Sequence, residues 1–330
     1  MKALIEKVPI PAAGVALGLA ALGILLQPLS EAFHIIAGIL SLFMVIMLAL
    51  KIIIFPRMVR EDLKNPVFAS VSATLFMTLM QLATYLAPVA YTAAFVIWVA
   101  AIVAHFALMI WFTLVFVVKF DLKTVFPTYF ITYVGIIVAS LTSPTFGMQD
   151  VGLIIFWFGF ACYMALLVVI SLRYLKHEVP ESAKPLFCIF AAPMSLSLAG
   201  FLAVSPDPNA IGIAVMAVFA QLFLVLVISQ MPKLLKIKFY PSYAAMTFPF
   251  VISASALFKT LTYFEGLGFG GAPCTVLHVL AVIETIIAAI MVLYVFGHYM
   301  RFFFRRVEGK PTEPPLTSEE IDRFEKEIDA

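Results

Sequence analysis

The sequence predicts an all-α integral membrane protein, and three observations support that fold class. Hydrophobic residues make up 63% of the 330 positions and charged residues only 12%, whereas a soluble domain is roughly half apolar and a quarter charged. The mean hydropathy of +1.08 agrees with this composition. Apolar runs of about 20 residues, long enough to cross the hydrocarbon core as helices, recur along the chain.

Ten such runs predict ten transmembrane helices, at residues 9–27, 32–55, 67–87, 90–118, 126–143, 151–175, 185–204, 210–231, 241–264 and 275–304. Successive pairs of runs are joined by short polar or Gly/Pro-rich loops, such as SPDPNA and EGLGFGGAP. This spacing predicts five helical hairpins. We expect a transmembrane domain over residues 1–308 and a cytoplasmic tail over 309–330.

The basic residues predict the orientation of the chain. Of the 21 Lys and Arg residues, all except Lys259 lie near the N-terminus, near the connections that follow even-numbered runs, or after the last run. The positive-inside rule places these regions in the cytoplasm. We therefore expect a multi-pass protein of the plasma or inner membrane with both termini inside the cell.

The odd-numbered runs share a composition that the even-numbered runs lack. Each has a proline near its cytoplasmic start, followed by several glycine or hydroxyl residues. Proline suits the first turn of a helix because the N–H groups there have no partner within the helix. Small residues also serve close helix packing. Because five alternate runs share the bias, we expect an inner ring of five helices around a central path, surrounded by five bulky outer helices.

The charges of the inner runs favour a channel over a carrier. The five runs contain no Asp or Glu, and Lys259 near the outer end of the ninth is their one basic residue. A proton-coupled carrier usually has an ionisable relay in its core, whereas hydroxyls and helix ends form the weak sites that a conducting pore needs. The basic cytoplasmic side weakly favours anions over cations.

The ninth run places a proline directly after a large ring, in YPSYAAMTFPFVISASALFK (240–259). Pro249 cannot donate a helical hydrogen bond, so a kink is expected there. Pro241, Phe248 and Ser255 recur every seven residues and lie roughly on one helix face. Such a helix could present the Phe248 ring to a pore. The alternative from periodicity is that Phe248 packs against a neighbouring helix.

Five segments of the inner runs resemble corresponding helices of one known family: PIPAAGVALGLAAL (9–22), NPVFASVSATL (65–75), FPTYFITYVGIIVAS (126–140), FAAPMSLSLAGFLA (190–203) and YAAMTFPFVISASA (243–256). The family is that of the tellurite-resistance/dicarboxylate transporters, which includes bacterial TehA proteins and the slow-type anion channels of plant guard cells. The resemblance covers about residues 8–304.

This resemblance implies five hairpins in a quasi-fivefold arrangement around a pore, and a homotrimer with one pore in each subunit. In the family, a phenylalanine on the ninth helix, just before Pro or Gly, occludes the pore. Phe248 followed by Pro249 matches that position, so the resemblance implies that Phe248 is the gate. The candidate kink and pore-lining residues are Gly14, Pro127, Pro193, Pro241, Pro249 and Ser255.

Two functions follow from these observations. The first is a passive channel for small monovalent anions such as chloride or nitrate. The second is a secondary transporter of dicarboxylate, sulfite or tellurite-type oxyanions, with or without proton coupling. An enzyme is least favoured, because the runs contain no nucleophile–base pair, metal cluster or cofactor motif. We expect no cofactor, no metal and no nucleic-acid partner.

Three further features sit outside this scheme. Glu284 is the one acidic residue well inside a run, and we predict an ion pair with Lys259, a proton relay being the alternative. His105 is expected to be hydrogen-bonded at a helix interface rather than to bind a ligand. In the tail, a capping box at Thr317 to Glu320 predicts a short amphipathic helix.

Overall fold

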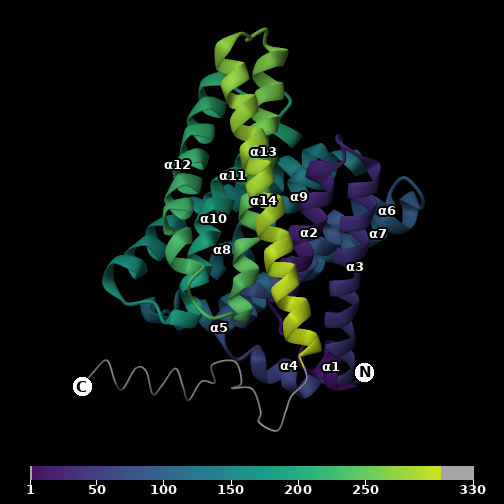
Figure 1. The fold of residues 1–330 in the computed structure, drawn as a ribbon, viewed down its shortest axis with the longest axis vertical. Coiled ribbons are helices and arrows are strands. Elements are labelled where there is room, and N and C mark those ends of the chain that lie inside the picture. The colour runs from purple at the N-terminus through teal and green to yellow at the C-terminus, as the bar shows by residue number, and fades with distance from the viewer. Residues whose placement is uncertain (1, 306–330) are drawn as a thin grey trace.

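The computed structural model describes residues 2–305, and every regular element within that range is a helix (Figure 1). Eight helical stretches in this range are long and apolar enough to cross a membrane, compared with the ten predicted. The other two predicted runs, 9–27 and 126–143, coincide with shorter apolar helices. The predicted helix in the tail, residues 309–330, lies outside the described residues.

The even-numbered runs form long, continuous helices. Polar side chains begin two of them: Ser30 Oγ accepts the Ala32 N–H at 3.2 Å, and Asn209 Oδ1 accepts the Gly212 N–H at 3.0 Å. Large apolar side chains are exposed along all of these helices, as expected for a surface facing lipid. They are α3 (Glu31–Ile54), α7 (Tyr91–Phe112) with a π-helical turn η1 (Thr113–Val117), α10 (Gln149–Lys176), α12 (Ala210–Leu234) and α14 (Ala272–Phe304).

The odd-numbered runs are shorter or divided. The first is α2 (Ala12–Leu26); the others are α5 (Pro66–Val71) with α6 (Ala73–Leu86), α8 (Thr128–Tyr133) with α9 (Ile137–Thr142) and the 3-10 turn η3 (Ser143–Phe146), the 3-10 segment η4 (Glu181–Ala191) with α11 (Ala192–Val204), and the 3-10 segment η5 (Pro241–Met246) with α13 (Phe248–Gly266). The connections contain α1 (Lys2–Glu6), α4 (Pro56–Asp62) and the 3-10 turn η2 (Leu122–Thr124).

The fifth run is interrupted at Gly135, so the prediction of one helix over 126–143 is wrong. The N–H groups of Val134 and Gly135 both donate to the Phe130 carbonyl, so α8 ends in a π-type turn, and the N–H groups of residues 137–139 then bond carbonyls three residues back. A Cβ atom at Gly135 would collide with the Ile131 carbonyl oxygen. Only glycine fits this turn, and the pattern of small residues in the sequence did not distinguish Gly135 from a glycine that serves helix packing.

Burial separates the two sets of helices. In the most apolar part of the η4–α11 and η5–α13 stretches, 78% of the residues are buried, compared with 22% in α12 and 33% in α14. The sequence-based division into inner odd-numbered and outer even-numbered runs therefore agrees with the burial of these elements.

The inner elements contact one another in a closed circuit. Helix α2 contacts α6, α6 contacts α8 and α9, α9 contacts α11, α11 contacts α13, and α13 returns to α2. Each outer helix contacts the inner element that precedes it in the chain, as with α3 on α2 and α14 on α13. The circuit thus joins the N-terminal and C-terminal parts of the described chain.

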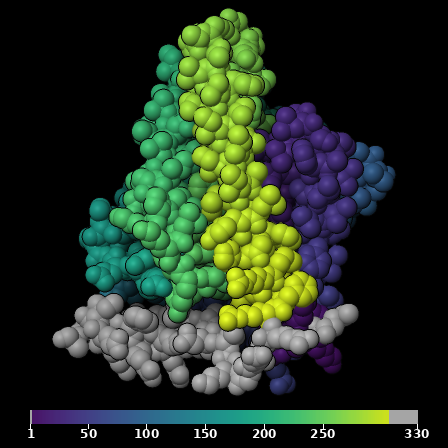
Figure 2. All heavy atoms as spheres, viewed as in Figure 1, coloured from purple at the N-terminus to yellow at the C-terminus, as the bar shows by residue number. Residues whose placement is uncertain are grey.

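Both ends of the described chain lie at the same end of the molecule (Figure 1). Lys7 Nζ donates to the Arg305 carbonyl at 2.9 Å. Nearby, Lys51 pairs with Asp62 of α4 at 3.6 Å, and burial raises the pKa of the Asp62 carboxyl while Lys51 opposes that shift. At the opposite end, the α13–α14 hairpin projects beyond the α2–α3 hairpin, as Figure 2 also shows.

Candidate functional site

Phe248 lies at the junction between two helical segments of the ninth run. The segment η5 ends at Met246 and α13 begins at Phe248, with Thr247 between them at φ −111° and ψ −85°. The sequence predicts a kink at Pro249 within one helix. The structure instead places Pro249 in the first turn of α13, where its missing N–H would have no helical partner in any case. The interruption therefore falls directly before the aromatic residue.

Helix α2 packs closely against this junction. The Thr247 hydroxyl donates to the carbonyl oxygens of Ala244 at 2.7 Å and of Gly14 at 3.0 Å. A Cβ added at Gly18 would lie 2.6 Å from Thr247 Cβ and 3.2 Å from the Phe248 backbone nitrogen. A Cβ added at Gly14 would lie 3.2 Å from Ala244 Cβ. The two glycines therefore set the spacing between α2 and the start of α13. Gly18, the closer to Phe248, was not a predicted site residue.

The Phe248 side chain is buried, with 6% of its surface exposed, and belongs to the main hydrophobic core. The rings just before it are held by aromatic contacts, since Phe239 and Tyr243 lie 5.4 Å apart and Phe239 also packs on Tyr299 of α14. Among residues 2–305, no ring pair of this kind includes Phe248. Stacking therefore does not restrain the rotamer of this side chain.

Hydroxyl groups connect the junction of the seventh run to that of the ninth. Ser195 Oγ and Ser253 Oγ lie 3.1 Å apart, and Ser195 also donates to the Ala191 carbonyl at 2.9 Å. Ser253 donates to the Pro249 carbonyl at 2.9 Å. These side chains satisfy carbonyls close to the two helix junctions, so the inner hydroxyls form part of the packing in this arrangement.

The other predicted kink and pore-lining residues occupy two kinds of position. Pro127 and Pro193 are buried at the starts of α8 and α11, and Pro241 begins η5, where its carbonyl accepts the Tyr299 hydroxyl. These prolines mark where segments begin rather than kinks within helices. Ser255 is half-buried and has no hydrogen-bond partner among the described residues.

Polar contacts also link the second hairpin to the third. Ser70 Oγ donates to Thr128 Oγ1 at 2.7 Å, and Thr132 Oγ1 donates to the Ser70 carbonyl at 3.2 Å. The buried His105 ring of α7 lies 2.8 Å from the Thr132 carbonyl. The expected role of His105, a hydrogen bond at a helix interface, is confirmed.

The predicted ion pair between Lys259 and Glu284 is not formed. The pairs within 4.0 Å in the described part of the chain join Glu31 to His34, Lys51 to Asp62 and Glu61 to Lys64. The Lys259 side chain is exposed, whereas Glu284 is buried between α12, α13 and α14. The two side chains therefore face different surroundings. The prediction was wrong because sequence periodicity alone does not reveal which face of α14 packs inward.

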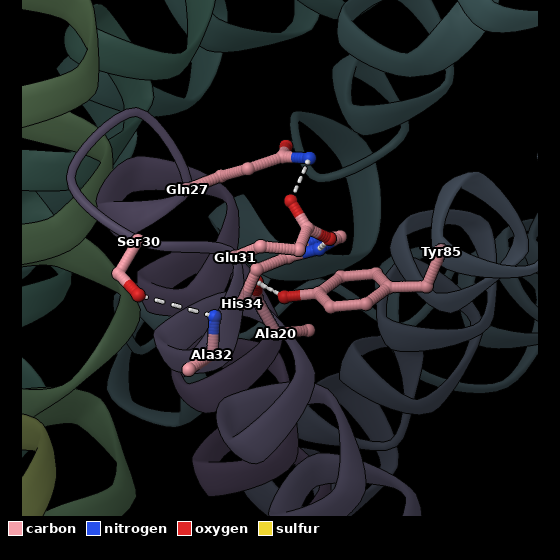
Figure 3. A network of polar contacts seen from close by, with 7 residues as sticks. All are labelled: Ala20, Gln27, Ser30, Glu31, Ala32, His34 and Tyr85. Atoms are coloured by element: carbon pink, nitrogen blue, oxygen red, sulfur yellow. Dashed lines mark hydrogen bonds and ion pairs between the residues drawn. The ribbon is translucent and has the colours of Figure 1, made fainter.

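A second polar cluster, around the connection between α2 and α3, was not predicted (Figure 3). The Tyr85 hydroxyl of α6 donates to the Ala20 carbonyl of α2 at 2.6 Å, and its ring stacks on His34 of α3 with centroids 3.9 Å apart. His34 Nδ1 lies 2.9 Å from Glu31 Oε1, and Glu31 Oε2 accepts a hydrogen bond from the Gln27 amide at 3.1 Å. This cluster connects an outer helix to two inner ones.

Metal ligation finds no support in residues 2–305, where no group of three or more His, Cys, Asp and Glu side chains is arranged to hold an ion. The three cysteines, Cys162, Cys188 and Cys274, are free. The candidate functional site thus consists of the helix junctions and the buried ring of Phe248.

Comparisons with known proteins agree with the arrangement described above. The SLAC1 family model, described as voltage-dependent anion channel, matches residues 7–300. No curated protein matches the chain. The match covers all five inner segments, from the glycines of α2 to the junction at Phe248, and both members of each hairpin. The chain therefore belongs to the SLAC1 family of anion channels and transporters, as the resemblance to the TehA and slow-type channel proteins implies.

Proposed function

We propose that the chain is an anion channel that conducts small monovalent anions, chloride- and nitrate-like, through a path inside each protomer. The observation that carries the proposal is the closed circuit of divided inner helices, with Phe248 at one of the divisions. In this proposal the inner and outer elements make ten crossings, arranged as five hairpins with quasi-fivefold symmetry. Residues 1–308 form the pore domain and 309–330 a cytoplasmic tail.

The composition of the inner elements supports weak anion binding. Serine and threonine hydroxyls and the starts of short helical segments offer partial positive charge to an anion. No acidic side chain lies in the five inner runs, 9–27, 67–87, 126–143, 185–204 and 241–264, so no fixed negative charge repels the ion along them. Lys259, which is exposed toward the outer end of the ninth run, is the one basic residue of these runs, so few fixed positive charges delay release of the ion.

The surroundings of Phe248 support its role as the gate. The residue begins a helix, its ring is buried, and no aromatic partner within residues 2–305 holds it. A change in the χ1 rotamer of Phe248 or a small movement at Thr247 would shift the ring without unfolding α13. The junction at Thr247 is the element that we expect to move.

Topology and assembly complete the proposal. The basic connections place both termini in the cytoplasm of a cell whose plasma or inner membrane holds the protein. The assembly is a homotrimer with three independent pores, as in the family that the sequence resembles. The exposed apolar faces of the outer helices are then divided between lipid and neighbouring protomers.

One observation favours the alternative function, a proton-linked transporter of dicarboxylate, sulfite or tellurite-type oxyanions. Glu284 is a buried acid within α14, and intramembrane acids often serve in proton transfer. It lies outside the inner ring, however, on the outer helix α14, in a crevice that α14 forms with α12 and α13. We therefore rank the channel first.

The test is the current carried by purified protein in planar bilayers, for the wild type and for Phe248→Ala. We expect discrete chloride and nitrate currents that rise about tenfold or more in the variant, equivalent to about 1.4 kcal/mol in the gating equilibrium. Phe258→Ala is the matched control, because Phe258 lies on the same helix but packs on His278 of α14. It should leave the current near the wild-type level.

One result would contradict the gate, and another would contradict the channel itself. Equal currents in Phe248→Ala and Phe258→Ala would remove the gate role from Phe248. Saturable uptake of a dicarboxylate driven by a pH gradient, without unitary current in any variant, would establish the carrier instead.

A further inference from the structure

Glu284 occupies an unusual position on α14. Only 7% of the residue is exposed, and its Oε2 atom is buried without a hydrogen-bond partner. The carboxyl group lines a narrow crevice with Leu224 and Ile228 of α12, Phe250 of α13 and Ile287 of α14. The crevice has no space for a water molecule. The acid therefore faces an almost wholly apolar environment.

Charged groups from the three neighbouring helices do not compensate this acid. On α12, the polar neighbour is the uncharged Gln221 amide. On α13, Lys259 is exposed and forms no ion pair with Glu284 in the described structure. On α14 itself, His278 packs against the ring of Phe258.

An ionised carboxylate in such a place would be costly, because neither water nor a cation offsets the loss of its hydration. The neutral acid carries no such cost. We propose that Glu284 is a proton-binding site, occupied in the arrangement seen here, and that release of its proton favours opening of the path at Phe248. The bound species is a proton, because the crevice admits nothing larger.

The contact with Phe250 connects this site to the gate. Phe250 is buried, lines the crevice and lies two residues after Phe248 in the first turn of α13. A negative charge on Glu284 would draw water or the Gln221 amide toward the carboxylate and disturb the packing of Phe250. Acid pH therefore stabilises the closed arrangement and alkaline pH weakens it. The link to conduction rests on the proposed channel function, whereas the proton site does not.

The first experiment observes the proton directly. Infrared difference spectroscopy of the full-length protein in lipid, titrated with pH, should give the carbonyl band of a protonated carboxylic acid at neutral pH, and this band should disappear at alkaline pH. Glu284→Gln should remove the band. Glu265→Gln, which alters an exposed acid on α13, should retain it. Glu284→Leu is a second variant, whose apolar side chain suits the crevice if the glutamine variant folds poorly.

The second experiment measures bilayer current as pH is lowered from mildly alkaline to mildly acid. The wild-type current should fall about fivefold or more, the lower end of usual coupling between two sites. Glu284→Gln and Glu284→Leu should keep a low current that varies less than about twofold. Glu265→Gln should behave as the wild type.

The outcomes separate the two proposals. Absence of the Glu284 band at neutral pH, or full pH dependence retained in both Glu284 variants, would overturn this inference. A titrating Glu284 band in a protein that passes no anion current, even as Phe248→Ala, would support the proton site and reject the channel.

Discussion

The inner stretch η5–α13 and the outer helix α12 contain similar numbers of residues, yet their backbones differ. Helix α12 continues for 25 residues, whereas η5–α13 changes from a 3-10 segment to an α-helix at Thr247. Only 22% of the most apolar part of α12 is buried, compared with 78% in η5–α13. A lipid-exposed backbone must satisfy its hydrogen bonds within one helix, while a buried backbone can use its neighbours.

The irregularities of the outer helices lie at their ends. Pro232 stands in the last turn of α12, and the π-helical turn Thr113–Val117 follows the end of α7. In the inner elements, interruptions instead fall within the runs, and hydroxyls such as Thr247 satisfy carbonyls across helices. The comparison indicates that a buried helix can be divided within a run, whereas a lipid-exposed helix is continuous.

The largest effect is expected from glycine substitutions that compare the two sets. In Gly18→Ala, the new Cβ would lie 2.6 Å from Thr247 Cβ, so α2 and α13 must separate, at a cost of about 1–3 kcal/mol. In Gly297→Ala on α14, no atom lies within 4 Å of the new Cβ, and helix propensity should stabilise the protein by up to about 1 kcal/mol. Thermal unfolding in detergent measures both. Equal changes in stability in the two variants would refute the distinction between tightly packed inner helices and loosely packed outer ones.

A smaller effect is expected when one cross-helix hydroxyl is removed. Thr247→Val leaves the buried Gly14 carbonyl without its side-chain donor and should cost about 1 kcal/mol of stability. It should also raise the frequency of channel opening. Thr285→Val on α14 is the control, because that hydroxyl bonds only the Ala281 carbonyl of its own helix. Unfolding midpoints and open probabilities of the two variants should differ. If they coincide, Thr247 does not hold the junction.

The smallest effect is expected for the bond between Ser195 and Ser253. A double-mutant cycle with alanine should give a coupling energy of about 0.6 kcal/mol, as for other hydrogen bonds between membrane helices. Ser195→Ala and Ser197→Ala should be additive, because Ser197 bonds the Pro193 carbonyl instead. Chemical denaturation of each variant supplies the energies. Additivity in both cycles would mean that the serine contact contributes nothing.

Several features of the fold were predictable from the sequence. The alternation of small, hydroxyl-rich runs with bulky runs predicted which elements are buried, and burial agrees with it. The proline positions predicted where segments begin, as at Pro66 and Pro241. The family was predicted from five short segments and is confirmed by the match to residues 7–300.

Other features were not predictable, because they depend on atoms from distant parts of the chain. The close approach of Gly18 to Thr247, for example, joins residues more than two hundred positions apart. The predicted Lys259–Glu284 pair failed for the same reason. Sequence spacing placed both residues toward one end of their helices without giving the direction of either side chain.

By itself, the sequence determined that this chain crosses a membrane many times, which runs are buried, and the family to which it belongs. Hydropathy and small-residue periodicity are local properties, and each helix expresses them without reference to the others. Only the tertiary structure decided that the break in the ninth run lies at Thr247, that Gly18 allows α2 to pack closely against it, and that Glu284 faces an apolar crevice. These three features depend on which helix faces pack together. Those faces are determined by contacts between inner helices that lie far apart in the sequence, such as α2 and α13.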